Sequence, residues 1–241
     1  MILIATKTVL NSDSVPQSIN LEVSDIKLTN TVRNLGVCLD PTLSFQQQIS
    51  SVCRNCYLEL RRISAVRHYL SEDITKKTVV CVCSFKTRLL QLIFGGLSYV
   101  SSLKLQKVQN NAARLISRTT RFAHVTPMLH SLHWLPTEQR IEYKLSLLCF
   151  KIISHQAPIY VSELLHLCTP SRWLRSSTDT RVFRTSSFRT KSCGHRSFSY
   201  QAPIIWNQLP VSVRHFSSVS SFKSTMKTFR FLKAFSSVLL P

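Results

Sequence analysis

The spacing of apolar residues changes from short runs to a helical period at about residue 44. Residues 1–43 contain short apolar runs at 2–5, 21–28 and 33–39, the last ended by Asp40-Pro41. Runs of this length between polar residues predict short β-strands. We expect 21–23 and 26–28 to pair as a ribbon around Ser24-Asp25, and all these strands to belong to the edge of a larger sheet, because so few strands are unstable alone.

From Ser44 onward, apolar residues recur every three or four positions, which predicts amphipathic helices. Ser44, Ser71, Thr137 and Ser221 are residue types that cap helix starts. We expect helices from 44, from 71 to about 94, from 101 or 102, from 137, over 161–167 and from 221. The chain has only 4 glycines in 241 residues, which also disfavours a turn-rich β fold. The predicted fold is mainly α with a small N-terminal β portion.

Composition divides the chain into four expected parts. Residues 1–43 carry the strands, 44–120 form a helical bundle, and 121–168 form a helical extension. Residues 169–241 are rich in Ser, Thr and Arg, and Asp179 is the last acid of the chain. We expect this part to be basic and partly irregular, with an aromatic segment at 201–209 and a terminal helix.

Charge is the strongest signal in the composition. Lys and Arg total 31 against 11 Asp and Glu, a formal net charge of +20. A compact body with this charge repels itself unless counter-charge is nearby, and phosphate polymers are the commonest partner of such surfaces. The alternative is a basic protein whose charge serves solubility alone, although an excess of Asp and Glu improves solubility more than an excess of Lys and Arg does.

The helix expected from residue 101 or 102 carries the clearest candidate site. Its cations fall on one arc beside its apolar stripe, and a phosphate backbone could follow such a face. The alternative is an ordinary solvated helix face. No aromatic residue is interleaved with these cations, so we expect recognition of the backbone rather than base stacking. The candidate binding residues are Lys104, Lys107, Arg114, Arg118 and Arg121.

Other motifs do not support catalysis or metal binding. Cys53-x-x-Cys56 is half of a zinc site, and we interpret it as two core thiols on a helix. His124, His130 and His133 have no nearby acid or cysteine and are interpreted as polar groups at a loop–helix junction. The chain has no Gly-x-Ser-x-Gly turn and no glycine-rich phosphate loop. We therefore expect no catalytic residue, no metal, no cofactor and no small-molecule substrate.

Cysteines and hydropathy bear on the compartment. The 8 cysteines lie mostly among apolar residues, and the N-terminal residues lack the pattern of a signal peptide. We expect reduced thiols in an intracellular protein of the nucleus or cytoplasm. No apolar run reaches the roughly 18 residues that span a bilayer, so no membrane partner is expected.

Five segments, taken in order, resemble one family. They are 32–45, 105–116, 124–136, 160–165 and 202–210, and they include Ala112-Ala113-Arg114-Leu115, Leu132-His133-Trp134-Leu135-Pro136 and Trp206-Asn207-Gln208-Leu209-Pro210. In this order and rough spacing they resemble the C-terminal region of the reverse transcriptase polyprotein of LINE-type, non-LTR retrotransposons. The similarity covers nearly the whole chain, although none of these segments is catalytic.

The resemblance implies that 1–43 corresponds to the last palm strands, 44–120 to the thumb and the rest to a C-terminal extension. A thumb holds the template–primer duplex, so the implied partner is RNA or an RNA–DNA duplex, and a palm domain in another chain is a second implied partner. The catalytic Tyr-x-Asp-Asp and the endonuclease of that family are absent here. The chain also departs from the family after Arg88-Leu89, where a segment is shortened.

Three hypotheses follow. The chain is a non-catalytic fragment that binds nucleic acid through phosphate contacts, or a decayed retrotransposon reading frame with no selected function. The third is an active polymerase, which requires a palm from another chain.

Overall fold

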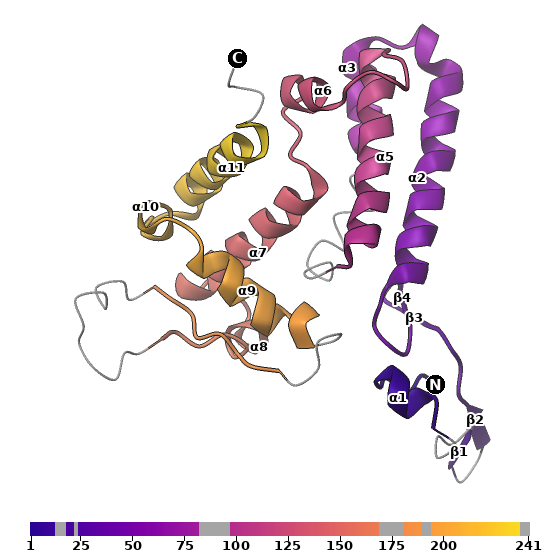
Figure 1. Cartoon of the computed structure of the whole chain (residues 1–241), viewed down its shortest axis with the longest axis vertical. Coiled ribbons are helices and arrows are strands. Elements are labelled where there is room, and N and C mark those ends of the chain that lie inside the picture. The colour runs from indigo at the N-terminus through magenta and orange to yellow at the C-terminus, as the bar shows by residue number, and fades with distance from the viewer. Residues whose placement is uncertain (13–17, 22–23, 82–96, 169–180, 189–193, 237–241) are drawn as a thin grey trace.

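The computed structural model describes residues 1–12, 18–21, 24–81, 97–168, 181–188 and 194–236, and within them the chain is mainly helical (Figure 1). In the residues that the structure describes, strands occur only in the N-terminal part, as two small antiparallel hairpins. The prediction of a mainly α fold with a small N-terminal β portion is confirmed.

The N-terminal strands differ in detail from the prediction. Residues 2–5 are irregular and lead into a short helix, α1 (Lys7–Leu10). β1 (Ser18–Leu21) pairs with β2 (Ser24–Lys27), so Ser24 and Asp25 lie in a strand and not in the turn. The run at 33–39 is a second hairpin, β3 (Val32–Asn34) and β4 (Val37–Leu39), because Leu35 and Gly36 both take positive φ, as a tight hairpin turn requires. The described hairpins do not join into one sheet.

The helices described next along the chain are α2 (Gln46–Val66), α3 (Glu72–Val79) and α5 (Tyr99–Ser117), with the single turn η1 (Arg67–Tyr69) after α2. The expected cap of α3 is confirmed, since Ser71 Oγ accepts the N–H of Ile74. The other two helix starts were predicted wrongly. Phe45, in the left-handed region, precedes α2, and α5 begins at Tyr99 after Ser98. The expected helix end near residue 94 lies outside the described residues.

Asp40, not Ser44, organises the start of α2. Its carboxylate accepts the backbone N–H of Ser44 at 2.8 Å and of Phe45 at 2.7 Å, and the Thr42 hydroxyl at 2.8 Å. Leu43 and Phe45 both have positive φ, a conformation that is unfavourable for side-chain-bearing residues. The three hydrogen bonds to Asp40 stabilise this turn and set the direction in which α2 leaves it.

The aliphatic core joins α2, α3 and α5 to the helices that follow. Branched and small side chains dominate it, and the small ones let α2 and α5 lie side by side (Figure 1). Its buried members are Ile49, Val52, Cys53, Cys56, Leu60, Ile63, Val79, Leu105, Val108, Ala112, Ala113, Ile116, Val125, Leu129, Leu132, Ile141, Leu145 and Phe235.

The second half of the chain is also largely helical where it is described. Its elements are α6 (Thr126–Ser131), α7 (Thr137–Ile153), α8 (Ile159–Ser162), η4 (Gly194–Arg196), α9 (Phe198–Asn207), α10 (Val211–Arg214) and α11 (Val219–Phe235). The helix expected at 161–167 is a single turn that begins earlier, after Pro158. The cap of α11 is Ser218 and not Ser221, and Thr137 is the first residue of α7, preceded by Pro136.

The aromatic core lies between α7, α9 and α11. Phe150 stacks on Phe222 with ring centroids 4.3 Å apart, and Trp206 contacts both Phe222 and Phe183. Its buried members are Cys149, Phe150, Ile152, Leu165, Phe183, Ala202, Trp206, Leu209, Val213, Phe222 and Met226. Because α7 contributes its first half to the aliphatic core and its second half to the aromatic core, this helix connects the two.

Candidate nucleic-acid interface

The predicted cations of α5 lie on one side of the helix. At 100° per residue, positions 104, 107, 111, 114 and 118 fall within an arc of about 80°. Lys104, Lys107 and Arg118 are exposed, while the apolar stripe of the helix, which includes Leu105 and Val108, is buried. Because the apolar stripe is buried, the cations on the other side of the helix are exposed to solvent. The helical period keeps them within one arc.

Arg114 differs from its neighbours on this arc. Its guanidinium donates to the Ala123 carbonyl at 3.3 Å and to Asn111 Oδ1 at 3.4 Å, and the side chain is half-buried. Arg114 thus holds the turn after α5 against the helix. Arg118 follows the last helical residue in the left-handed conformation, and its N–H donates to the Arg114 carbonyl.

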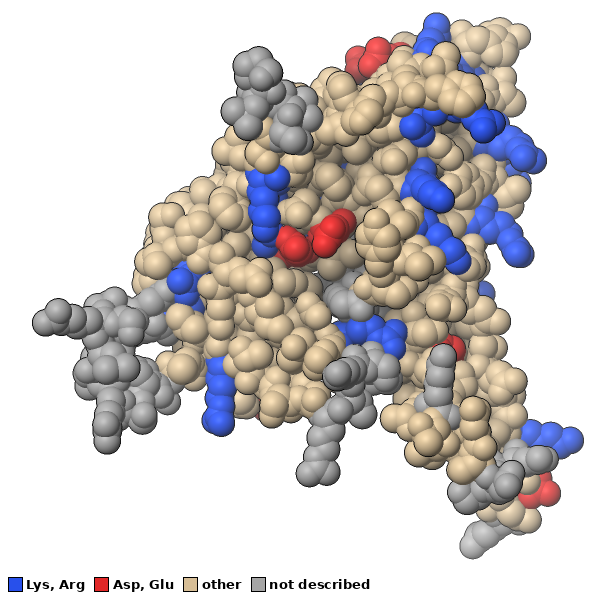
Figure 2. All heavy atoms as spheres, in the orientation of Figure 1, with Lys and Arg blue, Asp and Glu red and all other residues tan. Residues whose placement is uncertain are grey.

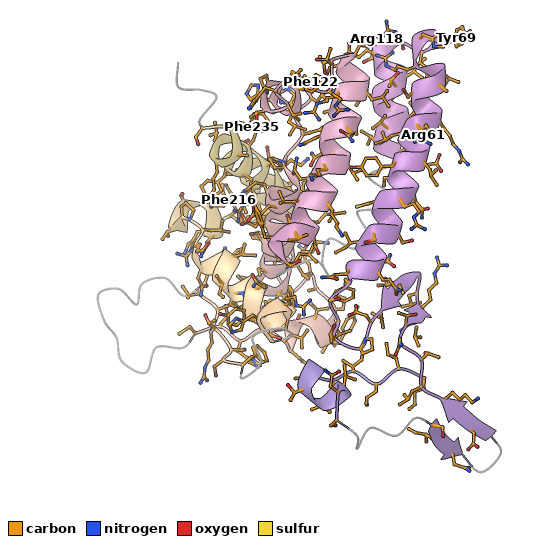
Figure 3. The ribbon with its side chains drawn as sticks, turned by 45° about the vertical axis from the view of Figure 1, so that its right-hand side comes forward. Arg61, Tyr69, Arg118, Phe122, Phe216 and Phe235 are labelled. Atoms are coloured by element: carbon orange, nitrogen blue, oxygen red, sulfur yellow. The ribbon has the colours of Figure 1, made fainter. Side chains whose placement is uncertain are left out.

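Exposed aromatic rings accompany the cations where α5 ends. Figure 3 shows Tyr69, Arg118 and Phe122 at the same end of the molecule. Tyr69 is 82% exposed and Phe122 is 87% exposed, and the Arg121 guanidinium lies 5.2 Å from the centroid of the Phe122 ring. Sequence reasoning missed these rings because they lie outside the period of α5. The only sequence feature that could have indicated them was a large aromatic residue within a polar turn, namely Tyr69 after α2 and Phe122 after α5.

The face continues onto α2. Arg54, Arg61 and Arg62 are exposed on this helix, and Arg62 donates to Glu59 Oε1 at 3.2 Å. Figure 2 shows that Lys and Arg side chains gather over the α2 and α5 side of the molecule, with few acids among them. The exposed cations of the two adjacent helices and of the turn after α5 form a surface that we call the α2–α5 face. It is defined by Arg54, Arg61, Arg62, Lys104, Lys107, Arg118 and Arg121.

The Cys53-x-x-Cys56 pair lies inside the aliphatic core beneath this face. Burial raises the pKa of the Cys53 thiol to about 11, the nearby Cys56 adds to this effect, and Lys104 opposes it. A thiol with this pKa stays protonated at neutral pH and is a poor nucleophile and metal ligand. Cys53, Cys56 and Cys149 are buried as expected of core thiols, whereas Cys81 and Cys168 are exposed.

The histidines after α5 contact aromatic side chains. His130 lies 5.0 Å from Phe231 and 5.4 Å from Phe235 between ring centroids, and His133 lies 5.6 Å from Phe231. Among the described residues, no group of three or more His, Cys, Asp or Glu side chains is placed to hold a metal ion.

Several arginines are directed into the protein. Arg67 donates to three backbone carbonyls, those of Leu70, Leu115 and Ile116, at 2.8–3.1 Å. Arg181 donates to the carbonyls of residues 214 and 216, and Arg196 to those of residues 42 and 43. Arg230 is buried and pairs with Glu142. The net charge therefore overstates the charge available at the surface.

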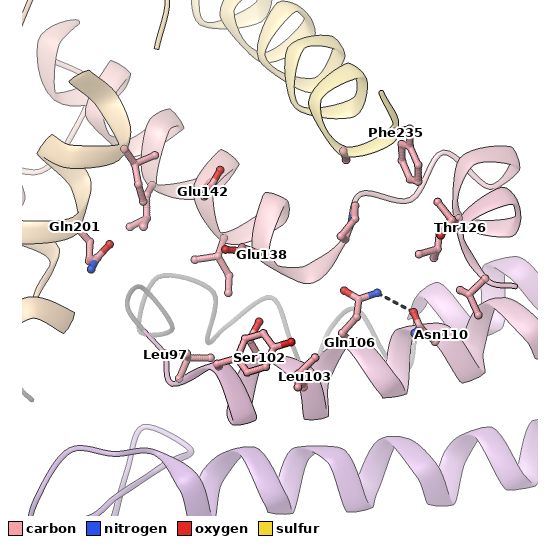
Figure 4. Close-up of a pocket in the computed structure, with 18 of the residues that line it drawn as sticks. Leu97, Ser102, Leu103, Gln106, Asn110, Thr126, Glu138, Glu142, Gln201 and Phe235 are labelled. Atoms are coloured by element: carbon pink, nitrogen blue, oxygen red, sulfur yellow. Dashed lines mark hydrogen bonds between the residues drawn. The ribbon is translucent and has the colours of Figure 1, made fainter. Parts of the chain in front are cut away.

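A cleft of about 750 Å³ lies between α5 and the pair α7 and α9. Figure 4 shows Glu138 and Glu142 on one wall and Gln106, bonded to Asn110 at 2.8 Å, on the other. The carboxylates make this cleft a poor site for phosphate. The described lining of this cleft includes none of the exposed cations of α5.

Comparison with protein-family models, curated proteins and solved structures found no match for the chain. In the part of the chain that the structure describes, no helix has both the length and the apolar character to cross a bilayer.

Proposed function

We propose that the chain binds RNA or an RNA–DNA duplex through backbone phosphates, using the α2–α5 face. The single observation that carries this proposal is the exposed row of Lys104, Lys107 and Arg118 along one side of α5. A row of cations on a rigid helix can follow a regular phosphate backbone without reading its sequence. This role agrees with that of a polymerase thumb, which the sequence resemblance implies.

The adjacent α2 helix supports the proposal. Its exposed Arg54 and Arg61 widen the positive surface, and Glu59, half-buried and bonded to Arg62, is the one acid of α2. Tyr69, Arg118 and Phe122 lie at the same end of the molecule (Figure 3), and the Arg121 guanidinium lies over the Phe122 ring, so an exposed ring at this end could cover the terminal base pair of a duplex. The proposal therefore combines phosphate contacts along the face with aromatic contact at its end.

A salt titration tests this function. Affinity of the full chain for a 12-base-pair RNA–DNA duplex is measured by fluorescence anisotropy between 50 and 200 mM salt, because each phosphate contact contributes roughly 0.9 to the slope of log affinity against log salt. The double variant K104A/K107A should lower this slope by about 1.8.

The matched control is K27A/K233A, which removes the same charge from exposed positions on β2 and α11. It should leave the slope nearly unchanged. An affinity indifferent to salt, or equal losses in the two double variants, would reject the α2–α5 face as the binding surface.

A further inference from the structure

A second basic surface lies in a groove between α7 and α11. The groove has a volume of about 930 Å³, near the upper end of the roughly 300–1,000 Å³ typical of ligand sites. α7 and α11 lie side by side (Figure 1), and residues 133–135, before α7, contribute to the lining. Its described lining contains no Asp or Glu and has five cations, namely Arg140, Lys144, Lys151, Lys223 and Lys227.

The two faces of α7 carry opposite charge. Residues 138, 141, 142 and 145 face the cleft next to α5, whereas 140, 143, 144, 147 and 151 line the groove, about 150° away around the helix. Glu138 and Glu142 therefore lie on the cleft side, and Glu142 is bonded to the buried Arg230. The acids of α7 leave the positive potential of the groove largely intact.

Aromatic side chains lie among these cations. Trp134 is half-buried, and the Arg140 guanidinium lies 5.7 Å from the centroid of its ring. Arg140 Nε also donates to the Leu135 carbonyl at 2.8 Å, which fixes the guanidinium beside the ring. Half-buried Tyr143 and Phe231 complete the aromatic lining. Proteins that bind unpaired bases use aromatic rings fixed in position to stack on the bases, and nearby cations to contact the phosphates. The groove contains both.

We propose that the α7–α11 groove binds a short single-stranded segment of nucleic acid. A base stacks on Trp134, and Lys223 and Lys227, exposed on α11, neutralise the adjoining phosphates. A duplex keeps its bases stacked inward and cannot offer one to a groove, so this site is distinct in ligand as well as position from the α2–α5 face. An acidic peptide would match the charge, but its carboxylates do not stack on the ring of Trp134.

The test uses the full chain and a fluorescein-labelled twelve-residue oligouridylate, followed by anisotropy. The variant W134L keeps an apolar side chain but removes the ring, and it should weaken binding about tenfold. K227A should lower the salt slope by about 0.7, the value of one contact with a single strand. K233A is the matched control, since Lys233 is exposed on the same helix but lies outside the groove lining, and its slope should be that of the unmodified chain.

Wild-type oligouridylate affinity in folded W134L, or equal effects of K227A and K233A, would overturn the groove proposal. Equal displacement of the oligouridylate by polyglutamate of matched charge would also overturn it, because the site would then recognise charge alone. The K104A/K107A variant separates this outcome from the proposed duplex function. It should weaken duplex binding while oligouridylate affinity changes less than twofold, and W134L should do the reverse.

Discussion

Around the aliphatic core Lys104, Lys107 and Arg118 are exposed to solvent, whereas around the aromatic core Arg181 and Arg230 are held by partners within the protein. Long helices satisfy their own carbonyls except in the last turn, and there Arg67 donates to the final carbonyls of α5. The aromatic core instead holds irregular segments such as 181–184, whose carbonyls need other donors. Arg67 and Arg181 are structural because backbone carbonyls accept their hydrogen bonds, and Arg230 is structural because it pairs with Glu142. Local partners, more than the net charge, therefore decide whether an arginine is available to a ligand.

The largest expected effect tests the aromatic core. Trp206 is fully buried and its Nε1 donates to the Arg181 carbonyl at 2.7 Å. Trp206→Ala should lower the free energy of unfolding by about 3–5 kcal/mol, because it leaves a large cavity and removes that donor. Urea unfolding followed by circular dichroism measures the change. Leu58→Ala, at an exposed position of α2, should stay within about 0.5 kcal/mol; comparable losses in both variants would contradict the division between core and surface.

The buried ion pair gives the next effect. Burial lowers the pKa of the Arg230 guanidinium, and Glu142 opposes this effect. Glu142→Gln leaves a buried cation without its counter-charge and should destabilise the protein by about 3 kcal/mol. The double variant E142Q/R230M should recover much of that loss. Glu138→Gln, one turn earlier on α7 and exposed, is the control in the same denaturation assay; a similar loss there would refute a special role for the pair.

A pair of arginine variants sharpens the comparison between structural and available cations. Arg67→Met removes three hydrogen bonds to carbonyls and should cost about 2 kcal/mol of stability, with duplex affinity unchanged at a temperature where the variant is folded. Arg61→Met, exposed on α2, should do the opposite, keeping stability within about 0.5 kcal/mol and weakening duplex binding. Thermal melts and anisotropy measure the two properties; a stability loss in R61M but not in R67M would invert the assignment.

The smallest expected effect concerns the turn before α2. Burial acts to raise the pKa of Asp40, but hydrogen bonds from Ser44, Thr42 and Phe45 outweigh it, so the folded pKa lies below 3.8. The unfolded chain then binds the proton more tightly, and this stabilisation is present above about pH 4 and lost as the pH falls through the folded value. Asp40→Asn should cost about 1 kcal/mol at pH 7.

Acid titration of the melting temperature checks the sign for Asp40. The D40N variant should lose less stability than the unmodified chain as the pH falls from 5 to 3. Asp25→Asn, exposed on β2, should follow the unmodified chain. Parallel acid curves for D40N and the unmodified chain would show that the Asp40 carboxylate contributes no such stabilisation.

Many of the helices could be predicted because apolar residues recur along them at the helical spacing. The apolar stripes of α2, α5 and α11 are long enough to identify each helix, and the Ser71 cap is a local signal. The turn at 35–36 was missed because Leu35 rarely takes positive φ. α9 was recognised only as an aromatic segment, since Pro203 within a helix obscures its pattern.

The candidate site also has a part that could be predicted from the sequence and a part that could not. The arc on α5 follows from spacing within one helix, so Lys104 and Lys107 could be named from sequence. The bonds of Arg114, the position of Phe122 and the groove beside Trp134 depend on segments that meet only in three dimensions. No spacing rule within a single element contains that information.

The position of Phe235 has a consequence for biosynthesis. This ring belongs to the aliphatic core although it is in the last turn of α11, more than a hundred residues after α5. A ribosome releases α2, α3 and α5 long before it releases Phe235, so the nascent chain carries an incompletely covered apolar surface until α11 has been made. Nascent chains halted before residue 219 should therefore bind chaperones that recognise apolar surface more strongly than the finished protein does.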